Sequence, residues 1–210
     1  MSVPKFRIVF FISALFISSG SYSYGKNYEN KKYVCTIDSL PLPLAIIPIN
    51  HKFYDFCDTL SVLLWSDTGY TELIKPSHLR NLLAQDTNLL AALVEIAEHK
   101  YSKEERKGVP SIYSIIDTMT CTKLIAALGN PRLLLFPLGL GTSSLGVATN
   151  GMINVRLYDL KSGDLVYEKD QQLLVEQGGE EGAKSLILGL LGFAREHYDK
   201  YFFKKFKESK

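Results

Sequence analysis

The sequence predicts an α/β fold: a mixed sheet with helices on both faces, and a C-terminal hairpin followed by a long helix. Two continuous apolar runs, 42–49 and 133–138, have the length and composition of strands buried on both faces. Segments with helical apolar spacing separate them and alternate with shorter strand-like segments. This order is typical of a layered α/β domain.

The first apolar run contains Pro43 and Pro48 near its two ends, where a missing N–H donor costs least. Apolar residues at helical spacing from Phe53 to Leu64 then predict a helix that ends near 67–69. Residues 70–74 are expected to form a short strand. Pro76 begins another helix, because proline is favoured in a first helical turn.

Asp86 or Thr87 begins a further helix that runs to about Lys100, and the charged stretch 100–108 is expected to be a solvated loop. The next helix is predicted as one piece from Pro110 to Ala127, and Gly129-Asn130-Pro131 ends it. A glycine-rich loop over 139–150 is expected after the second apolar strand.

Alternating apolar and polar residues from Ile153 predict the clearest hairpin of the chain, which returns through Leu165 and Tyr167. Residues 159–164 supply its turn, and Gly163 suits a positive φ with a bulge. A long helix over about 179–205 follows.

Residues 1–23 have the order of a secretory signal peptide: positive Lys5 and Arg7, the apolar run 8–17, then small residues. The apolar run is about ten residues, whereas a membrane span needs roughly 20. We expect cleavage after Gly20 or Ser23 and a periplasmic or secreted product, with an uncleaved anchor as the alternative. Residues 24–33 are expected to be a flexible lead-in, and 34–210 a single α/β domain.

Lys5 and Arg7 account for the difference between the 24 Lys and Arg and the 22 Asp and Glu residues, so the mature chain is neutral. A nucleic-acid binder usually carries a concentrated basic face, and none is visible outside the extreme C-terminus. That end, 198–207, mixes aromatic residues with lysines. It is predicted to be a helix end, and the alternative is a docking patch for a membrane surface, as a peripheral contact, or for a partner.

No pattern of reactive residues stands out. Three cysteines are too few for a disulfide framework; one Cys35–Cys57 bridge and three buried thiols are the alternatives. The four histidines are scattered, without metal-ligand spacing, and no nucleophile elbow occurs. The segment 139–146 lacks the Gly-Lys-Ser/Thr ending of a phosphate loop. We therefore predict no catalytic, cofactor-binding or metal-binding residues, and no enzyme.

Three segments resemble a family of cell-envelope α/β domains. Residues 45–50 are similar to its first strand, an apolar run that ends in proline, an apolar residue and asparagine. Residues 63–79 resemble its helix, second strand and proline-led helix start. Residues 128–135 and 153–167 resemble its strand and hairpin, whose turn reads aspartate-x-x-x-glycine, here Asp159 to Gly163. The order of these pieces is the stronger evidence.

This family includes the amino-terminal domain of the Tol–Pal periplasmic protein, the lipoprotein activators of penicillin-binding proteins, and the periplasmic domain of the curli secretion channel. The family's lipobox is missing, because Cys35 follows Lys32-Tyr33-Val34. The resemblance implies an exported, non-enzymatic adaptor that binds other envelope proteins. We expect the contact residues in the glycine-rich loop and the hairpin turn: Gly139, Gly141, Thr142, Ser143, Ser144, Lys161, Ser162 and Gly163.

An alternative function is a small-ligand-binding protein or hydrolase with its site at the strand ends near Gly139. Open α/β sheets commonly bind ligands at the carboxyl ends of their strands.

Overall fold

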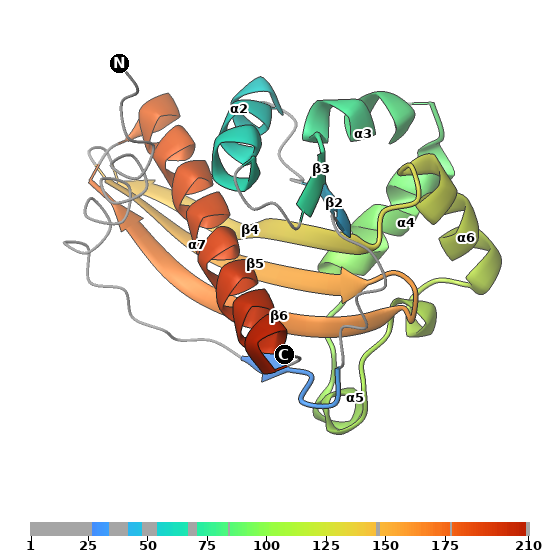
Figure 1. The fold of residues 1–210 in the computed structure, drawn as a ribbon. Coiled ribbons are helices and arrows are strands. Elements are labelled where there is room, and N and C mark those ends of the chain that lie inside the picture. The colour runs from blue at the N-terminus through green and yellow to red at the C-terminus, as the bar shows by residue number, and fades with distance from the viewer. Residues whose placement is uncertain are drawn as a thin grey trace, which may run out of the picture.

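The computed structural model describes residues 27–33, 42–47, 54–66, 71–83, 85–145, 148–176 and 178–208. These residues form a six-stranded sheet in the order β1-β6-β5-β4-β2-β3 (Figure 1). Strand β2 is parallel to β3 and β4, and the other pairs are antiparallel. The mixed α/β fold is thus confirmed. The strands are β1 (Tyr28–Glu29), β2 (Leu42–Ile46), β3 (Thr71–Ile74), β4 (Leu133–Leu145), β5 (Ala148–Asp159) and β6 (Asp164–Val175).

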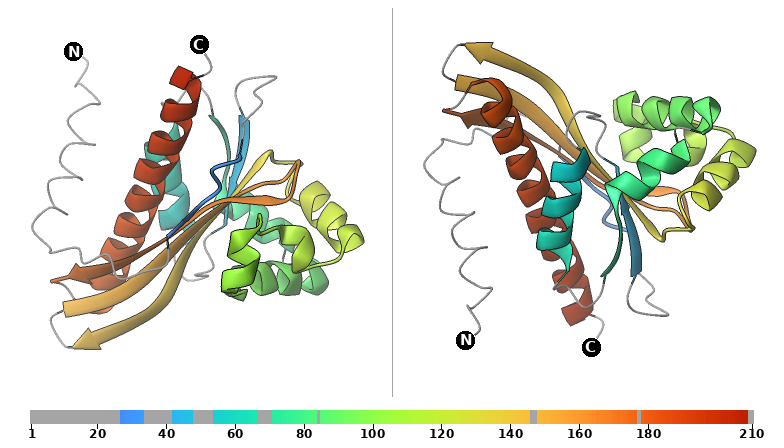
Figure 2. Two further views of the ribbon diagram at one scale, coloured as in Figure 1. Left: turned by 90° about the horizontal axis from the view of Figure 1, so that it is seen from below. Right: turned by 90° about the horizontal axis from the view of Figure 1, so that it is seen from above.

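Helices cover both faces of the sheet, as predicted. Helices α2 and α7 lie on one face, and α4, α5 and α6 gather on the other (Figure 2). Figure 2 also shows that this second group covers only one end of the long β4–β6 strands, whereas α7 runs along most of their length. The helices are α2 (Tyr54–Trp65), α3 (Pro76–Leu83), α4 (Thr87–Glu98), α5 (Lys103–Lys107), the 3₁₀ turn η2 (Ile112–Ser114), α6 (Thr118–Ala127) and α7 (Gly179–Glu208).

The two predicted apolar strands are neighbours at the centre of the sheet, where Leu44 faces Leu133 in register. Successive side chains of β4 enter opposite cores. Leu133 and Leu135 pack with α2 and α7, and Leu134 and Phe136 pack with α4 and α6. Each such side chain that leaves water stabilises the fold by about 1.5–3 kcal/mol, which explains why the sequence is apolar at every position from Leu133 to Leu138.

Strand β1 lies in the segment predicted to be a flexible lead-in, so that prediction is wrong for the described residues 27–33. Tyr28 and Glu29 pair with Glu168 and Tyr167, and the Asn30 N–H donates to the Val166 carbonyl at 3.0 Å. The signal segment 1–23 lies outside the described residues. Within the described part of the chain, no helix combines the length and apolar character needed to cross a membrane.

The predicted solvated loop 100–108 contains α5. Ser102 and Glu105 form a capping box there, in which each side chain accepts from the other residue's backbone N–H. The predicted single helix 110–127 is also divided, into η2 and α6. Asp117 separates them because its carboxylate accepts from the Met119 and Thr120 N–H groups, both at 3.0 Å, and so caps α6.

The largest correction concerns the predicted glycine-rich loop 139–150. Strand β4 continues through Gly139 to Leu145 and pairs with β5 from Ala148 onward. The register shifts between Gly139 and Gly141, which marks a β-bulge. Gly139 and Gly141 thus lie in a long hairpin, at its bulge, and not in a loop.

Cys57 and Cys121 are buried free thiols, and Cys35 lies outside the described residues. Burial raises the pKa of the Cys57 thiol to about 11, which keeps it protonated at neutral pH. A buried protonated thiol behaves as a small apolar side chain.

Candidate protein-contact surface

The predicted contact residues fall into two groups at opposite ends of the long hairpin. Gly139, Gly141, Thr142, Ser143 and Ser144 lie in β4, where Thr142 pairs with Gly151. Lys161, Ser162 and Gly163 form the turn after β5. The stretch of β5 from Gly151 to Asp159 spans on the order of 25 Å at the usual rise of a strand. The two groups therefore cannot form one continuous patch.

The buried carboxylate of Asp159 holds the turn from the interior of the protein. Asp159 is 2% exposed and accepts two hydrogen bonds from the Arg132 guanidinium, both at 2.8 Å. It also accepts from the Tyr33 hydroxyl at 2.6 Å and from the Lys161 N–H at 2.9 Å. Its carbonyl accepts from the Gly163 N–H at 2.8 Å. The aspartate of the Asp-x-x-x-Gly motif thus organises both the interior and the turn.

These bonds govern the charge of Asp159. Burial raises its pKa, but the hydrogen bonds from Arg132, Tyr33 and the Lys161 N–H outweigh burial, and the pKa lies below the usual 3.8. A carboxylate with a depressed folded-state pKa stabilises the fold above its unfolded pKa, and this contribution is lost as the pH falls through the folded pKa.

We expect Asp159→Asn to lower the free energy of unfolding by about 2 kcal/mol near neutral pH, because the buried ion pair between Asp159 and Arg132 is lost. The difference from the native protein should shrink as the pH falls below about 3.8. Urea unfolding at a series of pH values measures this. Tyr33→Phe, which removes one of the bonds, should move the loss to higher pH. A difference between Asp159→Asn and the native chain that stays constant down to about pH 2.5 would contradict the assignment.

Gly163 has the predicted positive φ, 76°. The structure adds a second reason why this position needs glycine, which the sequence does not reveal. The Tyr113 ring of η2 lies directly against it, so that a Cβ at this position would meet two ring carbons at 2.4 and 2.5 Å. The Ser111 hydroxyl and the Ile112 N–H both donate to the Gly163 carbonyl, at 3.1 and 2.8 Å. The turn and η2 are therefore one packed unit.

The outer side of this unit is exposed. Tyr113 is 41% exposed although its ring packs on Gly163, and Lys161 and Ser162 are exposed beside it. We name Tyr113, Lys161 and Ser162 the turn patch. Sequence reasoning identified Lys161 and Ser162 but missed Tyr113, since the contact joins residues fifty positions apart and leaves no local signal.

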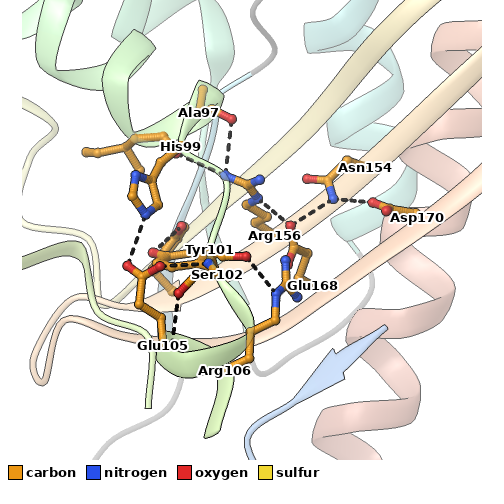
Figure 3. A network of polar contacts seen from close by, with 12 residues as sticks. Ala97, His99, Tyr101, Ser102, Glu105, Arg106, Asn154, Arg156, Glu168 and Asp170 are labelled. Atoms are coloured by element: carbon orange, nitrogen blue, oxygen red, sulfur yellow. Dashed lines mark hydrogen bonds and ion pairs between the residues drawn. The ribbon is translucent and has the colours of Figure 1, made fainter. Parts of the chain in front are cut away.

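A network of buried charges lies deeper on the same face of the sheet (Figure 3). Arg156 of β5 and Glu168 of β6 are 4% and 3% exposed and form an ion pair at 3.0 Å. The Arg156 guanidinium also donates to the carbonyls of Ile96 and Ala97, at 3.1 Å each, near the end of α4. A cation at a helix C-terminus is favourable because it faces the negative end of the helix dipole.

Three further side chains complete the network. Arg106 of α5 contacts Glu168 at 2.5 Å, and Asn154 donates to both Glu168 and Asp170 (Figure 3). The network thus contains two guanidinium and two carboxylate groups, and its formal charges cancel. Such mutual compensation is what makes buried charge tolerable. The network joins α4 and α5 to the hairpin.

The described residues contain no group of three or more His, Cys, Asp or Glu side chains that could hold a metal ion. Of the C-terminal aromatic and lysine stretch, Tyr198 is fully buried. Its ring packs edge-on against Trp65 and its hydroxyl lies 2.9 Å from the Thr71 hydroxyl. Tyr198 therefore packs in the core. The side chains from Lys200 onward are outside the described part, and membrane contact through them stays a prediction.

No protein-family model matches the sequence, and no curated protein is similar to it. Among solved structures, the chain is similar to the PelC dodecamer from Paraburkholderia phytofirmans, at 7% identity and a TM-score of 0.38, covering 84% of this chain and 98% of that one. The LpoB C-terminal domain from Salmonella enterica has 13% identity, a TM-score of 0.34, and coverages of 69% and 88%. Lipoprotein GNA1162 from Neisseria meningitidis has 14% identity, a TM-score of 0.39, and coverages of 72% and 95%.

With TM-scores from 0.34 to 0.39, the likenesses establish neither family nor function. The envelope family therefore stays a prediction from the sequence.

Proposed function

We propose that this protein is an exported, non-enzymatic adaptor that binds another protein of the cell envelope through the turn patch. The observation that supports this most is the contrast between the two sides of the turn. Asp159 and its partners fix the backbone from inside, while Tyr113, Lys161 and Ser162 are presented outside.

This contrast favours protein binding for an energetic reason. A contact residue that must be ordered on binding costs about 0.5–1.5 kcal/mol of side-chain freedom, and a pre-ordered one costs less. Tyrosine combines a large contact area with few rotatable bonds, and it is enriched among residues that dominate binding energy. Tyr113 is already seated on Gly163, so a partner would gain its contact area at a low entropic cost.

The alternative ligand or hydrolase site near Gly139 loses its structural premise. It required that a strand end there, but β4 continues to Leu145 and is paired with β5 on both sides of the bulge. We therefore place the proposed contact at the turn.

Site-specific photocrosslinking in intact cells tests the proposal. A photoreactive residue at Ser162 should give a defined crosslinked partner. The same residue at Glu181, which is exposed at the start of α7, is the matched control and should not. Adding Tyr113→Ala should lower the crosslinked yield from Ser162 by on the order of 10-fold or more, as for a residue central to an interface.

Equal crosslinking patterns from Ser162 and Glu181 would count against the turn patch. Turnover of a substrate by the purified chain would count against the non-enzymatic assignment.

A further inference from the structure

Residues 102–109, which include α5, form a strap between two buried positions. Before the strap, Tyr101 is 2% exposed and its hydroxyl lies 3.0 Å from that of buried Tyr158. After it, Pro110 is buried and its carbonyl accepts from the Leu165 N–H at 2.8 Å. No residue of the strap itself is buried. A segment with so little buried surface has a low free energy of local opening.

One side chain connects the strap to the sheet through a buried contact. The Arg106 guanidinium contacts Glu168 at 2.5 Å and donates to the Tyr101 carbonyl at 3.2 Å (Figure 3). The strap's other ion pair to a neighbouring element, Glu105 with His99 at 3.3 Å, is partly exposed, where such pairs contribute little. Ser102 bonds with Glu105, and Lys107 with Glu104, within the strap itself.

Glu168, the partner of Arg106 on the sheet, keeps other partners when Arg106 is withdrawn. One carboxylate oxygen of Glu168 accepts from Arg156 at 3.0 Å and from Asn154 at 3.2 Å, and the other oxygen faces Arg106. Withdrawal of Arg106 therefore leaves Glu168 neutralised by Arg156. Opening the strap costs less than taking the network apart, which would leave a buried charge without a partner.

We propose that residues 102–109 open as a unit between Tyr101 and Pro110, and that the Arg106–Glu168 ion pair holds the closed state. Opening uncovers the second Glu168 oxygen on the face of the sheet that carries α4. A cationic group from solution or from a partner can then occupy the position that Arg106 leaves. The strap is thus a conformational switch separate from the turn patch.

Hydrogen exchange of the full chain, followed by mass spectrometry, tests this. In the native protein, peptides within 102–109 should exchange faster than those of α4, at rates that low concentrations of urea do not change. Exchange in α4 should accelerate with urea, because it requires larger unfolding. Arg106→Gln should accelerate exchange of the strap about 10-fold or more and that of α4 and β6 by less than about twofold. Lys107→Gln, an exposed neighbour in the same helix, is the control and should leave the strap unchanged.

Two results would overturn the proposal. One is strap exchange in the native protein that rises with urea in parallel with α4, since this indicates opening only by global unfolding. This measurement needs no variant, so it decides the question even if Arg106→Gln folds poorly. The other is an Arg106→Gln protein whose strap exchanges at the same rate as that of Lys107→Gln.

Discussion

Replacing Arg156 with methionine should lower the free energy of unfolding by about 3 kcal/mol, the largest loss we expect from a single exchange in the buried network. Methionine fills a similar volume but provides no charge and no donors. The carbonyls of Ile96 and Ala97 would lose their donor, and Glu168 would keep Arg106 as its cationic partner. Urea denaturation gives the change directly.

Lys123→Met is a suitable control, because Lys123 is exposed on α6 and surface exchanges usually alter stability by less than about 0.5 kcal/mol. The double variant Arg156→Met with Glu168→Leu should lose less stability than the sum of the two single variants, since it removes both charges together. Strictly additive losses would show that the two side chains do not act as a pair.

Gly163→Ala should cost about 2–4 kcal/mol, from two separate sources. A non-glycine residue at a φ of 76° costs roughly 1–2 kcal/mol. The new methyl group would also lie 2.4 Å from the Tyr113 ring, and forcing such a group into packed surroundings costs about 1–3 kcal/mol. Urea denaturation measures the combined loss of unfolding free energy.

Gly129 offers a matched control, because its φ is 83° but a Cβ there would meet nothing within 4 Å. Gly129→Ala should therefore show only the backbone cost. The difference in unfolding free energy between the two variants then measures the cost of the steric contacts at Gly163. In a Tyr113→Ala background, Gly163→Ala should lose most of its excess cost over Gly129→Ala; the Ser111 hydroxyl, 3.0 Å from the added Cβ, accounts for the remainder. If the excess is unchanged in that background, the ring contact is not the reason that this turn requires glycine.

Strong local patterns predicted much of the fold. The apolar runs of β2 and β4, the alternation of β5, and the proline at the start of α3 each carry their signal within a few residues. Gly163 was predicted in the correct conformation for the same reason. These features depend on which face of a single element is apolar, or on one backbone angle.

The features that sequence analysis missed depend on distant partners. Tyr28 and Glu29 form a strand only because β6 pairs with them, and residues 139–145 extend β4 because β5 lies alongside. Alternation places Asn154 and Arg156 on one face of the sheet. It does not reveal that Arg156 lies against the end of α4, or that Arg106 of α5 contacts the same Glu168 as Arg156. The candidate site was half predicted, since Tyr113 joins the turn through tertiary packing alone.

The sheet order has a consequence for how the chain acquires its structure. Strands β4, β5 and β6 are consecutive in sequence and pair with one another. Strand β1 has its partner far downstream in β6, and β2 pairs with distant β4 as well as with nearby β3. Contacts between nearby segments form fastest, because closing a long loop costs more entropy. The C-terminal strands are thus the natural nucleus, and an emerging chain cannot close its sheet until nearly all of it is available.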